Sequence, residues 1–454
     1  MSEALRTRAM IGSRSHAHSP QGCAKMAGLP HRNNTLSAMM KVMGHKLKDW
    51  RAVRGIFLPK VAPVLGLAVV LLGLLPGCTL MPVAERKIDL VQLQGLVERS
   101  VAEHKFPGAS LWVERENQHS QLQYGARTYQ SDARAIDART IFDVASLTKV
   151  VVTATAVQLL IDDRRLRMEQ RLGEVLPGCS GEGREAITLA HLLTHTSGLP
   201  AGISAMPPWS GKDEALRRAC ALTPVTSPGT AFRYSDVNFI LLGAIVERAS
   251  GESLDVFAAH RIFAPLGMLR SGYRPLTRFD ANDIAPTQRI PLNANASLHI
   301  DLAPGAELAG VVHDPTARFM GGVAGHAGLF STAEDLARFV RMLLSDGMAG
   351  GRPFLSRAAV ERLTTAQSPI TVKEKRSAGW DVDSPFSRPR GTLFSPASFG
   401  HTGFTGCAMW IDPASNAFYV LLTNRVYPDD KSVILPLYSE IGTLAAEALG
   451  VAQR

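Results

Sequence analysis

Patterns typical of β-strands lie near both ends of the chain and are missing from its middle. Short runs with the character of strands fall at 109–114, 121–124, 398–402, 407–411 and 417–423. Apolar residues with a helical period flank these runs at 88–104 and 433–448. We therefore expect an α/β fold with an added α part, in which one antiparallel sheet, flanked by helices, is built from both chain ends.

The middle of the chain, from about 150 to 390, consists mostly of candidate helices and of loops rich in Pro and Gly. The helical candidates are 213–221, 236–249, 255–263, 333–345 and 357–364, with a long apolar helix directly after Ser146. This pattern predicts a leader (1–78) and one domain (79–454). Within the domain, 79–140 and 391–454 form the α/β part, and 141–390 is a mostly helical inserted subdomain. Active residues are expected at the seam between these parts.

The net charge of +9 comes entirely from the leader. Residues 1–78 hold 11 Lys and Arg against 2 acids, and the remaining 38 basic and 38 acidic residues cancel. Residues 79–454, the body of the protein, carry no net charge and have no electrostatic reason to bind nucleic acid. We therefore expect no nucleic-acid partner.

The leader has the order of a secretory signal. Five basic residues between 46 and 60 precede the apolar stretch Val61–Leu75, which ends in Leu75-Pro76-Gly77-Cys78. A Cys after a small residue resembles the box of lipoprotein signals, in which Cys78 becomes the lipidated first residue and anchors the protein to a membrane. The alternative is an uncleaved inner-membrane anchor, because no charge occurs from Val61 to Ala84. Both alternatives export the body to the periplasmic face, and Thr79 after the Cys favours the outer membrane for a lipoprotein.

Three cysteines remain in the body, Cys179, Cys220 and Cys407. Their spacing is not that of metal ligands, and any one disulfide would leave a free thiol. We expect all three to be buried thiols.

Ser146 and Lys149 stand at the start of the long apolar helix. Residues three apart lie on one face of a helix, with about 5–6 Å between Cβ atoms. Lys149 can then take the hydroxyl proton of Ser146, if burial keeps the amine neutral. No other Ser in the sequence is followed by Lys three residues later. The structural alternative is a helix start with a solvated Lys.

Two further segments carry candidate site residues. Pro228–Asn238 is a turn that leads into a helix, where Tyr234 can relay a proton between leaving group and base. The alternative is a packed Tyr followed by a Ser and an Asp that cap the helix. Gly400-His401-Thr402-Gly403-Phe404-Thr405-Gly406 precedes a strand, and its glycines leave backbone open to a substrate chain or an oxyanion.

Together the three segments resemble the serine β-lactamase and penicillin-binding-protein superfamily, and class C β-lactamases, carboxypeptidases and related esterases in particular. The family pattern is Ser-x-x-Lys, a Tyr-x-Asn-like box and a Lys/His-Thr-Gly box. The segment His191–Pro200 is also frequent in this family. The segment Val312–Thr332 resembles the sequences of a narrower subgroup, the penicillin-binding protein 4B type of periplasmic serine hydrolase. The resemblance covers about 90 to 445 and implies a β-lactamase/transpeptidase-like fold.

The resemblance implies acyl transfer through Ser146, with Lys149 and Tyr234 as catalytic partners. Backbone N–H groups of Ser146 and Phe404 would stabilise the oxyanion, and water would release the acyl-enzyme. The implied substrates are the D-Ala-D-Ala ends of peptidoglycan fragments, with simple esters second. Neither a metal nor a cofactor is implied. The alternative from another class is a non-catalytic sensor of penicillin or cell-wall ligands, and the sequence does not indicate an oligomeric state.

Two residues depart from the family pattern. The middle box reads Tyr234-Ser235-Asp236, with an acid in place of the amide, and the third box begins with His401 in place of Lys. His401 would carry full positive charge only below its pKa, about 6.5 if unperturbed, and Asp236 nearby would raise that pKa. We therefore expect at best a weak β-lactamase, which acts on neutral esters more readily than on anionic substrates. His401, Thr402, Gly403 and Phe404 are expected to bind substrate together with Asp236.

Other histidines offer weaker candidate sites. His191 and His195 are four apart, as metal ligands on a helix can be, but the residues between them include no Glu to act as a base. His326 lies in a Gly-rich loop, where it either lines the active-site cleft or is a buried structural residue. No Gly-x-Ser-x-Gly motif occurs, which argues against an α/β-hydrolase fold.

Overall fold

The computed structural model describes residues 88–292 and 302–452. All of these described residues belong to the same unit of the chain. The leader with its predicted lipidation site, Cys78, lies outside the described residues. In the part that the structure does describe, no helix combines the length and the apolar character needed to cross a membrane.

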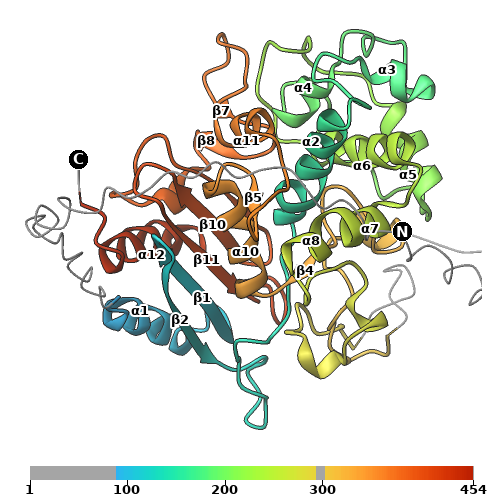
Figure 1. Cartoon of the computed structure of the whole chain (residues 1–454). Coiled ribbons are helices and arrows are strands. Elements are labelled where there is room, and N and C mark those ends of the chain that lie inside the picture. The colour runs from blue at the N-terminus through green and yellow to red at the C-terminus, as the bar shows by residue number, and fades with distance from the viewer. Residues whose placement is uncertain (1–87, 293–301, 453–454) are drawn as a thin grey trace, which may run out of the picture. The chain divides into compact units, whose positions relative to one another are not determined.

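A seven-stranded antiparallel sheet forms the centre of the described chain, in the order β2-β1-β11-β10-β9-β8-β7 (Figure 1). Its strands are β1 (Gly108–Arg115), β2 (Gln118–Gly125), β7 (Lys375–Arg376), β8 (Asp381–Asp383), β9 (Phe399–Gly403), β10 (Cys407–Asp412) and β11 (Ala417–Thr423). The first strand of the chain pairs with the last one, with Leu111 opposite Leu421. The predicted sheet built from both chain ends is therefore confirmed.

The sheet separates two hydrophobic cores. Strands β10 and β11 are buried at every position, because helices cover both faces of the sheet. Side chains alternate between the faces, so Leu111 and Leu421 enter one core while Trp112 and Val420 enter the other. The first core lies under α1 (Val91–Ala102) and α12 (Leu435–Ala448), which come from the two chain ends and lie on the same side of the sheet (Figure 1).

The second core joins the sheet to the helical part of the chain. Its helices are α2 (Thr155–Asp162), α3 (Leu172–Val175), α4 (Leu189–Leu193), α5 (Lys212–Cys220), α6 (Asp236–Ser250), α7 (Leu254–Ala258), α8 (Ala264–Leu266), α9 (Pro315–Phe319), α10 (Ala333–Leu344) and α11 (Arg357–Thr364). Two small two-stranded sheets also occur here, β3 (Phe142–Asp143) with β4 (Phe330–Ser331) and β5 (Met348–Ala349) with β6 (Arg352–Pro353). The predicted helical part, 141–390, also supplies β7 and β8 to the main sheet.

Two local predictions differ from the structure. The apolar segment after Ser146 is helical as predicted, but it runs as a π-helix over Lys149–Ala154 before it becomes α2. Cys179 and Cys220 form a disulfide, and only Cys407 is a buried free thiol as expected. The disulfide could not be predicted, because sequence spacing alone does not show that the segments of Cys179 and Cys220 meet.

Helix α6 and the loop before β4 approach each other through glycines. A Cβ atom added to Gly325 would lie 2.1 Å from the backbone oxygen of Phe239 and 3.0 Å from the Cα of Gly243. These contacts are with backbone atoms, which have no alternative rotamer to adopt. The close approach fixes the position of the next residue, His326.

We expect Gly325→Ala to lower the free energy of unfolding by about 2–3 kcal/mol, because the methyl group overpacks a rigid contact. Denaturant unfolding at constant pH measures the loss. Gly202→Ala is the matched control, since no atom lies within 4 Å of its added Cβ. Equal stability of the two variants would show that the helix and the loop can separate at little cost.

Candidate active site

Ser146 lies in a strained turn directly after β3. Ala145 before it has φ 47°, a left-handed conformation that is uncommon for a residue with a side chain. The buried carboxyl group of Asp143 accepts hydrogen bonds from the backbone N–H of Ala145 at 2.9 Å and of His313 at 2.7 Å. Burial raises the pKa of Asp143 to about 6 despite these bonds. Asp143 therefore holds the turn that presents Ser146.

Lys149 is fully buried and makes three polar contacts through Nζ. Nζ lies 2.9 Å from Ser146 Oγ, 2.9 Å from the backbone oxygen of His326 and 2.8 Å from Asp236 Oδ1. Burial lowers the pKa of Lys149, but the Asp236 carboxylate and Tyr234 outweigh burial and raise it. The condition set for proton transfer, that burial keeps this amine neutral, is therefore not met in the resting geometry, because Asp236 pairs with Lys149.

Tyr234 and Asp236 stand at the start of α6, on the same side as Lys149. Nζ of Lys149 is 5.2 Å from the centre of the Tyr234 ring. That ring stacks on His195, with 4.5 Å between the ring centroids. Nδ1 of His195 accepts the backbone N–H of Ser235 at 3.1 Å and so supports the segment that carries Tyr234.

The two histidines considered as metal ligands, His191 and His195, make separate local contacts. His191 belongs to a capping box with Thr188 at the start of α4. The pKa of His195 is far below its ordinary value, because of burial and of the positive charges of Arg376 and Lys149. Both rings therefore support backbone segments around the site.

His401 lies on β9, at the edge of the same cavity. Its Nδ1 is 2.8 Å from the backbone oxygen of Thr402, and its Nε2 is buried without a hydrogen-bond partner among the described residues. Burial and the charges of Arg376 and Lys149 hold the pKa of His401 well below its usual value. The expectation that Asp236 raises this pKa is wrong, since the Asp236 carboxylate pairs with Lys149 instead.

The end of β9 is tied to the turn that carries Ser146. A Cβ atom on Gly403 would lie 2.4 Å from the backbone oxygen of Val144. Thr405 donates its hydroxyl hydrogen to the backbone oxygen of Asp143 at 2.7 Å. The two segments expected to supply the oxyanion N–H groups, at Ser146 and Phe404, therefore belong to one fixed assembly.

The cavity at Ser146 has a volume of about 170 Å³. Its walls are formed by Ser146, Tyr234, Arg376, Asp381, Phe386, His401, Thr402 and Phe404. Five of these are predicted site residues. The structure thus brings all three sequence segments to one cavity.

Arg376 was not predicted, and it contributes a buried positive charge to this cavity. Its side chain is 1% exposed, and its Nη1 lies 3.2 Å from Asp381 Oδ1. Nη2 donates to the backbone oxygen of Gly379, while Nε has no hydrogen-bond partner among the described residues. A single Arg on a short strand gives no sequence signal for such a position.

His326 contacts Lys149 through its backbone oxygen and Asp314 through its ring. Nε2 of His326 is 2.9 Å from Asp314 Oδ1, and Asp314 also caps α9. Asp236, Asp314 and His326 each place one potential metal-ligating atom within 4.8 Å of the others. The Lys149 ammonium bonds to Asp236 and the His326 ring to Asp314, so each carboxylate already has a partner within the chain.

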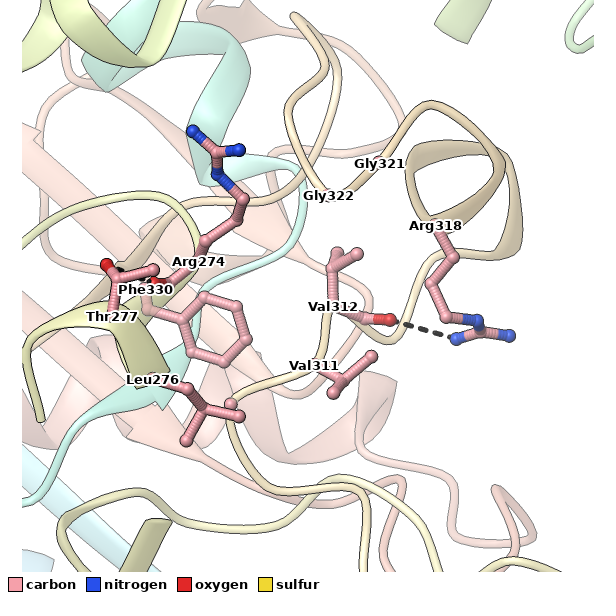
Figure 2. A pocket seen from close by; sticks show the side chains of 10 residues that line it. Arg274, Leu276, Thr277, Val311, Val312, Arg318, Gly321, Gly322 and Phe330 are labelled. Carbon is pink, nitrogen blue, oxygen red and sulfur yellow. Dashed lines mark hydrogen bonds between the residues drawn. The ribbon is translucent and has the colours of Figure 1, made fainter. Parts of the chain in front are cut away.

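A larger cavity, of about 350 Å³, contains none of the predicted site residues. Figure 2 shows its apolar side chains, Leu276, Val311, Val312 and Phe330, with the guanidinium groups of Arg274 and Arg318 at the edges. Arg318 donates to the backbone oxygen of Val312 at 2.9 Å, and Arg274 pairs with Asp255. Polar groups converge on the smaller cavity at Ser146, which is therefore the candidate active site.

Comparison with known proteins gives a consistent result. The family model described as Beta-lactamase matches residues 93–441. A protein of Escherichia coli K12 named "Putative D-alanyl-D-alanine carboxypeptidase" is 32% identical over 63% of this chain and 69% of its own length. A Bacillus subtilis protein named "N-acetylmuramyl-L-alanine amidase" is 30% identical over 75% of this chain and 80% of its own.

Among solved structures, a penicillin-binding protein homologue from Caulobacter crescentus has the same fold. It superposes with a TM-score of 0.62 at 21% identity, over 79% of this chain and 96% of its own. The match of the family model covers most of the described chain, and the fold agrees with it. The chain is a serine hydrolase that belongs to the serine β-lactamase and penicillin-binding-protein family.

Proposed function

We propose that the protein is a D-Ala-D-Ala carboxypeptidase that acts on cell-wall peptides through an acyl-enzyme on Ser146. The observation that carries this proposal is the buried Arg376 in the wall of the Ser146 cavity. A peptide that ends in D-Ala-D-Ala presents a carboxylate, and a guanidinium is the preferred partner of a carboxylate in proteins. The relative named as a carboxypeptidase supports the same assignment.

In the proposed reaction, Ser146 Oγ attacks the peptide carbonyl carbon while its proton passes to Lys149. The N–H groups of Ser146 and Phe404 stabilise the oxyanion, each by a few kcal/mol. Tyr234 lies beside Lys149 and passes the proton to the leaving D-Ala amine as the C–N bond breaks. Water then attacks the ester of Ser146 and releases the shortened peptide.

A second candidate substrate bond is the amide between muramic acid and L-Ala, because one relative is named an amidase. The two reactions differ in their products. A carboxypeptidase releases free D-Ala and leaves the stem peptide on the sugar, whereas an amidase releases the stem peptide. A digest of muropeptides separated by mass therefore distinguishes them.

We expect Ser146→Ala to abolish D-Ala release and the covalent adduct with a fluorescent penicillin, while the far-ultraviolet circular dichroism stays that of the wild type. Turnover of wild-type protein, measured beside the label, separates the hydrolase from a non-catalytic sensor. Continued D-Ala release by the folded variant would refute the nucleophile assignment. Stem-peptide release by the wild type would replace the carboxypeptidase with the amidase.

We expect Arg376→Gln, combined with Asp381→Asn to avoid an unpaired buried carboxylate, to reduce kcat/KM for a D-Ala-D-Ala peptide by roughly 10- to 100-fold. This range corresponds to the loss of one charge-assisted hydrogen bond. An uncharged p-nitrophenyl ester should be affected far less. Arg390→Gln is the matched control, because Arg390 pairs with Asp383 and does not line the cavity.

The pH dependence of the wild-type enzyme tests whether His401 binds the substrate carboxylate instead. The ratio of peptide to ester turnover in the wild type should stay constant from about pH 7.5 to about pH 5.5, because the pKa of His401 is held well below its usual value of about 6.5. A ratio that rises as the pH falls would assign carboxylate binding to a protonated His401. An equal loss for peptide and ester would remove Arg376 from substrate recognition.

We propose that the protein is exported and anchored by lipid on Cys78, at the periplasmic face of the outer membrane. The support comes from the order of basic, apolar and small residues before Cys78. Mass spectrometry of the mature N-terminus should find a lipid-modified Cys78 as the first residue. An unmodified peptide that runs from Leu75 through Cys78 would favour the uncleaved inner-membrane anchor.

A further inference from the structure

Lys149 is an ammonium in the resting geometry, because its Nζ lies 2.8 Å from the Asp236 carboxylate and this carboxylate raises the pKa of Lys149. An ammonium group has three N–H donors and no acceptor. Ser146 Oγ, the His326 backbone oxygen and Asp236 Oδ1 all lie within 2.9 Å of Nζ, and the Tyr234 side chain is a further hydrogen-bonding neighbour. Lys149 must therefore lose a proton before it can deprotonate Ser146.

Asp236 is the one anionic acceptor among these three contacts. Ser146 and the His326 carbonyl are neutral, whereas the carboxylate of Asp236 lies 2.8 Å from Nζ. The neighbouring Asp314 is already bonded to the ring of His326, so it does not compete for the Lys149 proton. The Asp236 side chain is 36% exposed, and it therefore connects the buried Lys149 to solvent.

We propose that Asp236 acts through Lys149 as the acceptor of its proton, so that Ser146, Lys149 and Asp236 form a proton relay. This inference rests on the proposed acyl-enzyme on Ser146. One N–H bond of the Lys149 ammonium breaks, and an O–H bond forms on the Asp236 carboxylate. The neutral amine then takes the hydroxyl proton of Ser146 as the bond from Oγ to the carbonyl carbon forms.

The relay ends in its starting state without an added reactant. Lys149 gives the proton from Ser146 to the leaving group through Tyr234, which lies beside it, as the carbonyl bond to that group breaks. Asp236 then returns its proton to Lys149, and the ion pair forms again. An amide in place of Asp236 has no oxygen that can hold a proton in this way at neutral pH, so the departure from the family's Tyr-x-Asn box gains a chemical role.

Other charged and titratable groups face the pair from several elements. They are Tyr234 before α6, His195 after α4, Arg376 on β7, His401 on β9, Asp143 on β3, and Asp314 and His326 before β4. The pKa values of His195 and His401 are both well below their usual value, mainly through burial. Burial also raises the pKa of Asp143 to about 6, so a test of the relay must extend above this value.

The test is the pH profile of kcat/KM for an uncharged p-nitrophenyl ester, in wild type and in Asp236→Asn. In the wild type the pair holds one shared proton, so the profile should be flat between about pH 6.5 and about pH 9. In Asp236→Asn, Lys149 must lose its proton to solvent. The profile should then rise by about tenfold per pH unit up to the pKa of Lys149 and level off above it, and this pKa is lower than in the wild type because the Asp236 carboxylate no longer offsets burial.

Two controls separate the relay from a structural role. Glu247→Gln removes another lysine-paired carboxylate from the same helix, α6, and should keep the flat profile. In Asp236→Ala, which opens space beside Lys149, sodium formate should restore ester turnover by at least about tenfold, because formate can hold the proton. A flat profile for Asp236→Asn, or no effect of formate on Asp236→Ala, would overturn the relay.

The ester keeps this test separate from the identity of the natural substrate. If D-Ala-D-Ala peptides are not cleaved but the two Asp236 variants behave as stated, the relay stands and the proposed substrate is wrong. If Ser146→Ala still hydrolyses the ester, the nucleophile assignment and the relay fail together. If Ser146→Ala is inactive and the Asp236→Asn profile is flat, only the relay fails.

Discussion

The buried ammonium of Lys149 is the interaction on which the arrangement of the site depends. A charge without solvent is costly, and the chain compensates it with three acceptors from three separate segments. These segments are the turn at Ser146, the start of α6 at Asp236 and the loop at His326. Each segment must be in place for the other contacts to form. The lysine therefore links the helical part of the chain to the turn beside the sheet.

Glycines make this convergence possible by letting backbone segments come close together. Gly325 lies against the Phe239 oxygen on α6, and this contact places the carbonyl of the next residue, His326, beside Lys149. On the other side of the cavity, Gly403 lies against the Val144 oxygen, so the end of β9 reaches the turn at Ser146. The site depends on backbone packing as much as on its side chains, and a methyl group at either glycine would displace a functional segment.

The sequence predicts the parts of the site that depend on short spacings, and it fails where the fold brings distant residues together. Ser146, Lys149 and Tyr234 are found because each belongs to a local pattern. The sheet is found because apolar strands of β character stand at both chain ends. Arg376 and Asp143 are missed, since an isolated Arg or Asp acquires its role only through burial. The pKa values of Lys149 and His401 differ from expectation for the same reason. Each pKa depends on which charged residue of another segment lies beside the group.

The two departures from the family pattern, His401 and Asp236, both make the charge of the site more negative than the family pattern would. His401 removes a cation that a Lys would supply, and its pKa stays low beside Lys149 and Arg376. Asp236 adds an anion, which Lys149 pairs with. Arg376 is likewise paired with Asp381, yet its Nε–H remains without a partner among the described residues. Each cation at the site thus has its own carboxylate. Under the proposed function, proton transfer at Lys149 and recognition at Arg376 then use different ion pairs, so binding a substrate carboxylate does not take the counter-ion that Lys149 needs.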